Sequence, residues 1–207
     1  MTLFSSPHVL DNERAVERPA QLEDDRELCE RVLRGDESAF ARLVEKHHAK
    51  IFRLVRGILG DWHRSEDVCQ EVFITLYRKL SSFRHDSLLS TWIYRVAVNA
   101  ALKARKRWRA RGAESLDGDP LSLARGLPAP GDPGPRSIEG GEVFQKLLAP
   151  LPEKLRAAVV LREQGGLSYD EISGVLGCSR GAVEQRLHRA MVMLREIWKE
   201  KHDWLER

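Results

Sequence analysis

The sequence predicts an all-α fold in which two small helical domains are joined by a flexible linker rich in glycine and proline. Apolar residues recur every three or four positions along most of the chain, and the alternation typical of strands is nearly absent. The main helix-breaking residues lie between these periodic runs. At 207 residues, the chain is long enough for one sizeable core or two small ones.

The periodic runs set the expected boundaries of the helices and domains. Helices are expected near residues 24–33, 38–59, 65–81, 90–107, 142–148, 152–163, 168–176 and 179–201. Residues 112–141 contain many glycines and prolines and few large apolar side chains, so they cannot bury enough surface to fold. Residues 1–23 lack periodicity and are expected to form a disordered extension. The two domains should therefore span residues 24–111 and 142–207.

Composition and charge exclude a membrane protein. The charged fraction of 31% and the apolar fraction of 42% are typical of a soluble globular protein, and a net charge of +3 is too small to indicate a partner. No apolar run approaches the roughly 18 residues that a membrane span requires. The N-terminus has no apolar signal core. We therefore expect a cytoplasmic protein that does not insert into membranes.

The reactive side chains suggest neither a metal site nor an enzyme. Cys29, Cys69 and Cys178 are far apart and fit neither a disulfide framework nor a metal-binding pair, so we expect three small buried hydrophobic residues. His47 and His48 are adjacent and point about 100° apart on a helix, which makes a shared metal difficult. No carboxylate cluster or pair of nucleophile and base has suggestive spacing. We expect no catalytic residue, metal or other cofactor, and a small nuclease is a distant alternative.

Residues 167–197, LSYDEISGVLGCSRGAVEQRLHRAMVMLREI, have the pattern of a helix-turn-helix. Ser168 and Glu171 form a capping box, and Gly177 supplies the left-handed turn before Ser179 caps the next helix. On that second helix a continuous apolar stripe should pack inward, formed by Val183, Leu187, Ala190, Met191 and Leu194. The opposite face is then free to meet another surface.

Gln185 and Arg189 lie almost opposite this stripe when residues are placed at 100° intervals. Glutamine can bridge N6 and N7 of adenine and arginine can bridge O6 and N7 of guanine, so both are candidate base-reading residues. The flanking residues should reach phosphates or groove edges, and they are Arg180, Arg186 and His188. The alternative is an ordinary solvated helix face, but the preceding turn favours DNA.

The helix expected at 65–81 has one inward and one outward face. Apolar residues at helical spacing should face the core, namely Val68, Val72, Leu76 and Leu80. The opposite side should carry Asp67, Gln70, Glu71, Ile74 and Arg78. An apolar Ile74 ringed by polar groups suggests a protein contact, although single exposed aliphatic residues are common on ordinary surfaces. Periodicity alone does not decide between these readings.

The helix expected at 90–107 ends in a strongly basic segment. An outward stripe steps by three, four, four and three through Trp92, Arg95, Asn99, Lys103 and Lys106. Residues 103–111 contain six basic side chains and no acid, so this end can neutralise phosphates and release counterions. Trp92 and Tyr94 at its start can stack on bases of single-stranded DNA. The alternative is a buried Trp92 and a solvated basic end.

These segments together resemble the extracytoplasmic-function sigma factors of bacterial RNA polymerase. The similar segments are GDESAFARLVEKHHAKIFRLVRGIL and SEDVCQEVFITLYRKLSSFR of region 2, STWIYRVAVNAALKARKR of its DNA-melting helix, and LPEKLRAAVVLREQGGLSYDEISGVLGCSRGAVEQRLHRA of region 4. The resemblance covers roughly residues 24–110 and 142–198. Several motifs in the right order are more specific than any one of them.

The resemblance implies a promoter-recognition subunit and assigns roles to three surfaces. Binding to the polymerase clamp falls on Asp67, Gln70, Glu71 and Phe73, with Ile74 and Arg78 on the same helix. Minus 10 recognition adds the base-capturing loop 83–90, with Arg84, His85 and Ser87, to the outward stripe that begins at Trp92. Minus 35 recognition falls on the helix-turn-helix residues Ser179, Arg180, Glu184, Gln185, Arg186, His188 and Arg189. Glu184 departs from the family's usual basic residue and can accept a hydrogen bond from N4 of cytosine.

The resemblance also implies the partners of the chain. These are the clamp and flap of core RNA polymerase, promoter DNA in duplex and single-stranded form, and an anti-sigma factor, with no obligate homo-oligomer. The linker should join two DNA-reading domains about 50 to 70 Å apart, and its fully extended limit is about 100 Å. The main alternative is a regulator that binds duplex DNA through the C-terminal domain alone.

Overall fold

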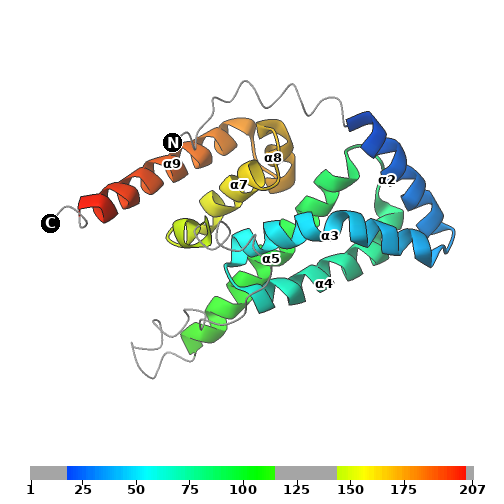
Figure 1. Cartoon of the computed structure of the whole chain (residues 1–207), viewed down its shortest axis with the longest axis horizontal. Coiled ribbons are helices and arrows are strands. Elements are labelled where there is room, and N and C mark those ends of the chain that lie inside the picture. Colours follow the sequence, from blue (N-terminus) through cyan, green and yellow to red (C-terminus); the bar gives the residue numbers. More distant parts are fainter. Residues whose placement is uncertain (1–17, 115–143, 204–207) are drawn as a thin grey trace.

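The computed structural model describes residues 18–114 and 144–203, and all of its regular structure within these ranges is helical. Side chains are described for residues 25–110 and 144–197. Most of the predicted N-terminal extension and of the predicted linker therefore lies outside the described residues. Figure 1 shows α2 to α5 forming one group of helices, with α7, α8 and α9 beside it. The prediction of an all-α fold with two helical domains is confirmed.

The first group is built from four long helices joined by short turns. The helices are α2 (Arg18–Leu33), α3 (Glu37–Leu59), α4 (Trp62–Lys79) and α5 (Leu89–Glu114), with a 3-10 turn, η1 (Leu80–Ser82), after α4. Asp36 starts α3 by accepting a hydrogen bond from the backbone N–H of Ala39, and Asp61 starts α4 in the same way through Arg64. Gly60 ends α3 with a φ of 78°, which favours glycine. These caps fold the chain back twice, so that α3, α4 and α5 pack on one another.

Two predicted boundaries of this group are wrong. Residues 18–23 are helical rather than disordered, because Pro19 is tolerated in a first turn and good helix formers follow it. Helix α5 continues to Glu114 and so enters the segment 112–141 that was predicted as linker. The residues between 107 and 114 include one glycine and no proline, so the helix has no strong signal to stop earlier.

The second group contains the expected helix-turn-helix. Residues 144–148 are helical, and α7 (Glu153–Glu163), α8 (Tyr169–Leu176) and α9 (Arg180–Asp203) follow. The capping box is confirmed, because the Ser168 hydroxyl accepts from the N–H of Glu171 while the Glu171 carboxylate accepts from the N–H of Ser168. Gly177 has a φ of 60° and a ψ of 42°, which is the predicted left-handed turn. Ser179 caps α9 by accepting from the N–H of Ala182.

The cysteines and histidines lie mostly where the sequence analysis expects them. Cys29 and Cys69 are buried, and burial raises the pKa of their thiols to about 11 and about 12. Cys178 is only half-buried, because it lies in the exposed turn between α8 and α9, so its predicted burial is wrong. His47 is 4% exposed and lies 3.3 Å from a carboxylate oxygen of Asp25, whereas His48 points outward. No group of three metal-binding side chains occurs among the described residues.

The two helical groups are in direct contact. Helix α7 packs on α3 and α8 packs on α5, and the buried apolar residues of both groups form one continuous cluster. Arg156 of α7 is only 3% exposed and donates hydrogen bonds to the carbonyl oxygens of Leu148 and Ile58. The sequence predicted two tethered domains and gave no indication of this packing.

The capping box makes a testable contribution to stability. Ser168→Ala removes the hydroxyl that satisfies the N–H of Glu171, and we expect it to lower the free energy of unfolding by about 1 kcal/mol. Ser173→Ala is the matched control, because the Ser173 hydroxyl only donates to the carbonyl of Asp170 within the same helix. Urea unfolding followed by circular dichroism measures both. Equal losses for the two variants would contradict the role of the cap.

Candidate nucleic-acid interface

The outward face of α9 carries the predicted base-reading residues. Val183 and Ala190 are fully buried against α7 and α8, which fixes the rotation of the helix about its axis. Gln185 and Arg189 consequently point into solvent, as expected. Of the flanking residues, His188 is exposed and Arg186 is half-buried. The geometry leaves a polar helix face free to enter a groove.

Arg180 connects the start of α9 to α8 through two ion pairs that the sequence analysis did not foresee. Its guanidinium lies 2.9 Å from a carboxylate oxygen of Asp170 and 3.2 Å from one of Glu184. All three side chains are more than half or about half exposed, so these pairs contribute little stability and can exchange for phosphate contacts. Glu184 therefore lies beside a cation, which offsets the charge that an acid brings to this surface.

The outward face of α5 is polar and open along most of its length. Arg95, Asn99, Lys103 and Lys106 are all exposed, as the helical stripe predicts. Trp92 at the start of this stripe is half-buried and packs against the core. Tyr94 is 7% exposed, so its ring is not free to stack on bases in this structure. Tyr94 follows Trp92 by two positions, so its side chain is turned about 200° around the helix from that of Trp92 and faces inward.

The loop before α5 holds an aromatic group next to Trp92. The ring of Phe83 lies 5.3 Å from the ring of Trp92 and 4.6 Å from that of His85, between centroids. His85 has a φ of 58°, the only positive φ of a residue other than glycine in the described chain. Such a conformation costs about 1 kcal/mol or more and often occurs at functional sites. Arg84, His85 and Ser87 are exposed, as expected for a loop that meets a ligand.

The exposed face of α4 is a polar surface with an apolar centre. Asp67, Gln70, Glu71 and Arg78 are exposed, and Ile74 is 52% exposed. Tyr77 is 54% exposed and its ring meets Phe40 of α3 edge to face. The sequence analysis missed Tyr77, although its spacing of three residues from Ile74 was a usable signal. Ile74 and Tyr77 are exposed apolar side chains one helical turn apart on this face, which suits a protein contact.

Phe73 is not part of this exposed face. It is 7% exposed and stacks on His48 of α3, with 5.9 Å between ring centroids. Its predicted contact with polymerase is therefore not supported by its position in this structure. One residue after Val72, it is turned about 100° around α4 and lies against α3. Phe73 holds α4 in place beneath the exposed residues.

Acids from other elements lie close to the basic end of α5. The carboxylate of Glu153 on α7 is 3.4 Å from Arg105 and 2.9 Å from Arg109, and Glu71 on α4 lies 4.0 Å from Arg107. Arg105 is largely buried and also donates to the carbonyl oxygen of Ile58. Only part of the basic segment is therefore free to meet phosphates, which local sequence could not show.

The chain is similar to known proteins over most of its length. Two family models match the chain, Sigma-70 region 2 over residues 43–111 and Sigma-70 region 4 over residues 141–194. The RNA polymerase sigma-H factor of Pseudomonas aeruginosa is 39% identical over 178 residues, which are 81% of this chain and 90% of that relative. The ECF RNA polymerase sigma-E factor of Escherichia coli K12 is 36% identical over 174 residues, 80% of this chain and 90% of that relative. The chain belongs to the sigma-70 family.

It is a sigma factor of the extracytoplasmic-function type, a class that binds core RNA polymerase and directs it to promoters. Two solved structures share its fold. CnrH, in complex with the cytosolic domain of CnrY, is 26% identical with a TM-score of 0.62 over 86% of this chain and 98% of CnrH. The sigma factor RpoE of Bartonella quintana, in complex with the anti-sigma factor NepR, is 22% identical with a TM-score of 0.61 over 77% of this chain and 96% of RpoE.

The prediction that α9 reads bases can be tested separately from the effect of simple charge. Arg189→Ala should cost about 1 to 3 kcal/mol at one base pair of the minus 35 element, because a bidentate contact to guanine is lost. Lys106→Ala should weaken promoter binding with little regard to sequence and reduce its salt dependence. Binding to a panel of single-base promoter variants measures both. A uniform loss for Arg189→Ala across minus 35 variants would exclude base reading by this side chain.

Proposed function

We propose that this sigma factor divides its work among three exposed surfaces. The face of α4 around Ile74 binds the polymerase clamp, the face of α5 with the preceding loop reads and melts the minus 10 element, and α9 reads the minus 35 element. One observation carries the proposal: these faces lie on three helices and point into solvent, while the opposite side of each helix is buried. The proposed domains are the predicted ranges 24–111 and 142–207, the first of them extended by the ends of α2 and α5 to residues 18–114.

Opening of the minus 10 element would depend on the aromatic group at the start of α5. The ring of Phe83 lies within stacking distance of the ring of His85 and of the ring of Trp92. A base extruded from the duplex loses its stacking, which costs a few kcal/mol, and a pocket of rings and polar groups can offset that loss. The exposed Arg84 and Ser87 can supply hydrogen bonds to such a base or its phosphate. Strand opening would then use binding energy rather than ATP.

The same proposal covers the regulation and location of the chain. The neighbours CnrH and RpoE were solved with CnrY and with the anti-sigma factor NepR, and we propose that a comparable partner controls this sigma factor. Sigma factors are initiation factors rather than enzymes, and this chain is proposed to catalyse nothing by itself. None of the described helices is long and apolar enough to cross a membrane. The proposed location is the cytoplasm.

In vitro transcription with purified core polymerase tests the function as a whole. We expect the full chain to direct initiation from discrete start sites on genomic DNA, and core polymerase alone to give no such starts. Tight duplex binding without core polymerase, unaffected by removal of residues 1–111, would instead support a regulator that acts through its C-terminal domain. The absence of specific initiation on all templates would count against the proposal.

The docking role of α4 predicts a charge-sensitive interface. Asp67→Lys reverses the charge that the exposed face presents to its partner and should weaken binding to core polymerase about tenfold, because the electrostatic complementarity of the interface would be lost. Glu45→Lys is the matched control, since it makes the same change at an exposed position of α3. Competition for core polymerase against a labelled sigma factor measures both. Unchanged assembly by Asp67→Lys would remove Asp67 from the interface.

A further inference from the structure

The arginine that begins α9 is held by acids from two helices. Nη1 of Arg180 donates to a carboxylate oxygen of Asp170 on α8 at 2.9 Å, and its Nε donates to one of Glu184 on α9 at 3.2 Å. A guanidinium carries five N–H donors in one plane, so two carboxylates on different nitrogens fix both its position and the direction of that plane. Nη2 has no partner among the residues that the structure describes. It therefore remains available to an acceptor outside the protein.

The turn between α8 and α9 sets the distance between these groups. Gly177 reverses the chain in its left-handed conformation, and Ser179 caps the first turn of α9. Ile172 of α8 and Val183 of α9 are both inaccessible to solvent, so the two helices are fixed against each other by their packing. The carboxylate of Asp170 consequently reaches α9 from a well-defined place on the neighbouring helix.

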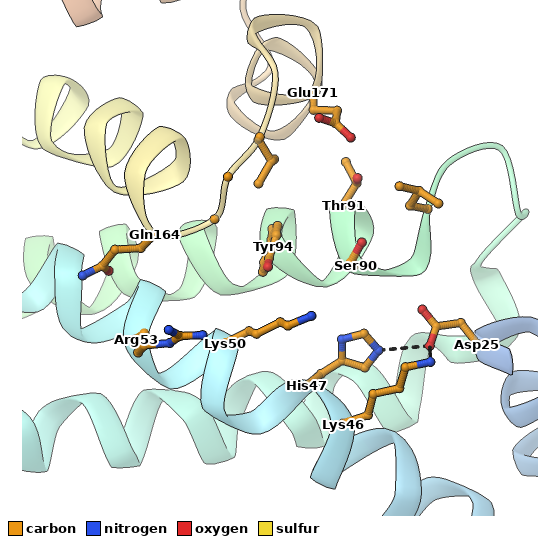
Figure 2. Close-up of a pocket in the computed structure, with 14 residues that line it drawn as sticks. Asp25, Lys46, His47, Lys50, Arg53, Ser90, Thr91, Tyr94, Gln164 and Glu171 are labelled. Carbon is orange, nitrogen blue, oxygen red and sulfur yellow. Dashed lines mark hydrogen bonds and ion pairs between the residues drawn. The ribbon is translucent and has the colours of Figure 1, made fainter. Parts of the chain in front are cut away.

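Two adjacent acids in the first turn of α8 serve different contacts. The Glu171 carboxylate accepts hydrogen bonds from the N–H and the hydroxyl of Ser168. Figure 2 shows Glu171 on the side of α8 that faces α5, where it lines a cavity of about 250 Å³ together with Thr91. Asp170 is one residue earlier and so is turned about 100° around the helix, and it pairs with Arg180 instead. Because Asp170 takes no part in the capping box, its carboxylate is available for this contact.

The charges of this group do not suit an arginine that only neutralises phosphates. Arg180, Asp170 and Glu184 bring one cation and two carboxylates together, a net charge of −1. Exchange of the two ion pairs for a phosphate would leave both acids without a cation beside the negative DNA backbone. A guanine edge can be met differently, because the N–H groups that the acids leave free can donate to it while the ion pairs persist.

The place of Arg180 in the fold suits contact with a base edge. The N-terminal residues of a recognition helix contact base edges in the major groove, and Arg180 is the first residue of α9. The next residue is Gly181, and a Cβ added there would meet nothing within 4 Å, so the surface beside the arginine is open. Nine residues separate Arg180 from Arg189, which is about 13 Å along the helix. The two arginines would therefore meet different base pairs.

We propose that Arg180 reads a guanine of the minus 35 element, and that Asp170 and Glu184 are positioning residues that hold its guanidinium for this contact. Glu184 then acts through Arg180 and does not itself read cytosine. The two acids lower the general attraction to the DNA backbone and increase the preference for one base, because a guanidinium already held in place loses less freedom when it binds. The inference rests on the proposed reading of the minus 35 element by α9.

Holoenzyme assembled from the full chain and core polymerase tests this proposal on promoter DNA that is randomised across the minus 35 element. Sequencing of the bound DNA gives the base preference at each position, and titration gives the total binding. The variants are Arg180→Ala, Asp170→Asn and Glu184→Gln, together with each acid substitution in the Arg180→Ala background. Glu163→Gln is the matched control, because Glu163 is an exposed acid at the end of α7.

We expect Arg180→Ala to lower the preference for guanine at one position about tenfold, because a bidentate contact is lost. Asp170→Asn and Glu184→Gln should each lower the same preference about threefold, the scale of one exposed ion pair. Total binding by these two variants should be unchanged or stronger, since each removes a negative charge near DNA. In the Arg180→Ala background neither acid substitution should change base preference further. The control should leave base preference unchanged, and circular dichroism should show the same helix content throughout.

A loss for Arg180→Ala that is spread evenly over all sequences would overturn base reading by this side chain. Acid variants that bind more strongly with an unchanged base preference would overturn the positioning role. A change caused by Glu184→Gln that persists in the Arg180→Ala background would mean that Glu184 reads a base itself. Wild-type holoenzyme that selects no minus 35 sequence would count against the proposed function of α9, whereas selection that is unaffected by Arg180→Ala would count against this inference alone.

Discussion

Burial of the apolar face of α3 is the interaction on which the rest of the molecule depends. This helix packs against α2, α4, α5 and α7, so it touches both helical groups, and only α5, through α8, does the same among the described helices with extensive contacts. Its inward residues Leu43, Ile51, Leu54, Val55 and Ile58 are essentially inaccessible to solvent. Each contributes about 1.5 to 3 kcal/mol by leaving water. The orientation of α4 and α5 on this face then decides which of their side chains remain outside.

The exposed surfaces follow from this packing rather than from any local preference. Phe73 and Tyr94 belong to the same helices as the residues that face solvent, but each is turned toward α3 or its neighbours and is buried. Ile74 and Tyr77 stay outside because no described helix covers that side of α4. The same helix can therefore support the core with one face and offer a contact with the other. The surfaces proposed to bind partners are therefore the helix faces that the hydrophobic core does not bury.

Sequence periodicity was sufficient to predict the helices, the helix-turn-helix and most of the exposed residues. The reason is that these features depend on residues close together in the sequence. The capping pair of Ser168 with Glu171 and the apolar stripe of α9 both follow from the geometry of a single helix. Contacts between segments distant in the sequence were out of reach. The pairing of Glu153 with Arg109, the approach of α7 to Gly57 and the ring of Phe83 beside Trp92 depend on how helices pack, and periodicity carries no such information.

The left-handed backbone of His85 limits how this surface can diversify. At a φ of 58°, β-branched residues are strongly disfavoured, while glycine, asparagine, aspartate and histidine are tolerated. In related chains that keep this turn, position 85 should be occupied by one of these four residue types. Neighbouring sites such as 84 and 87, which lack this restriction, are then the places where new nucleotide preferences can arise without rebuilding the loop.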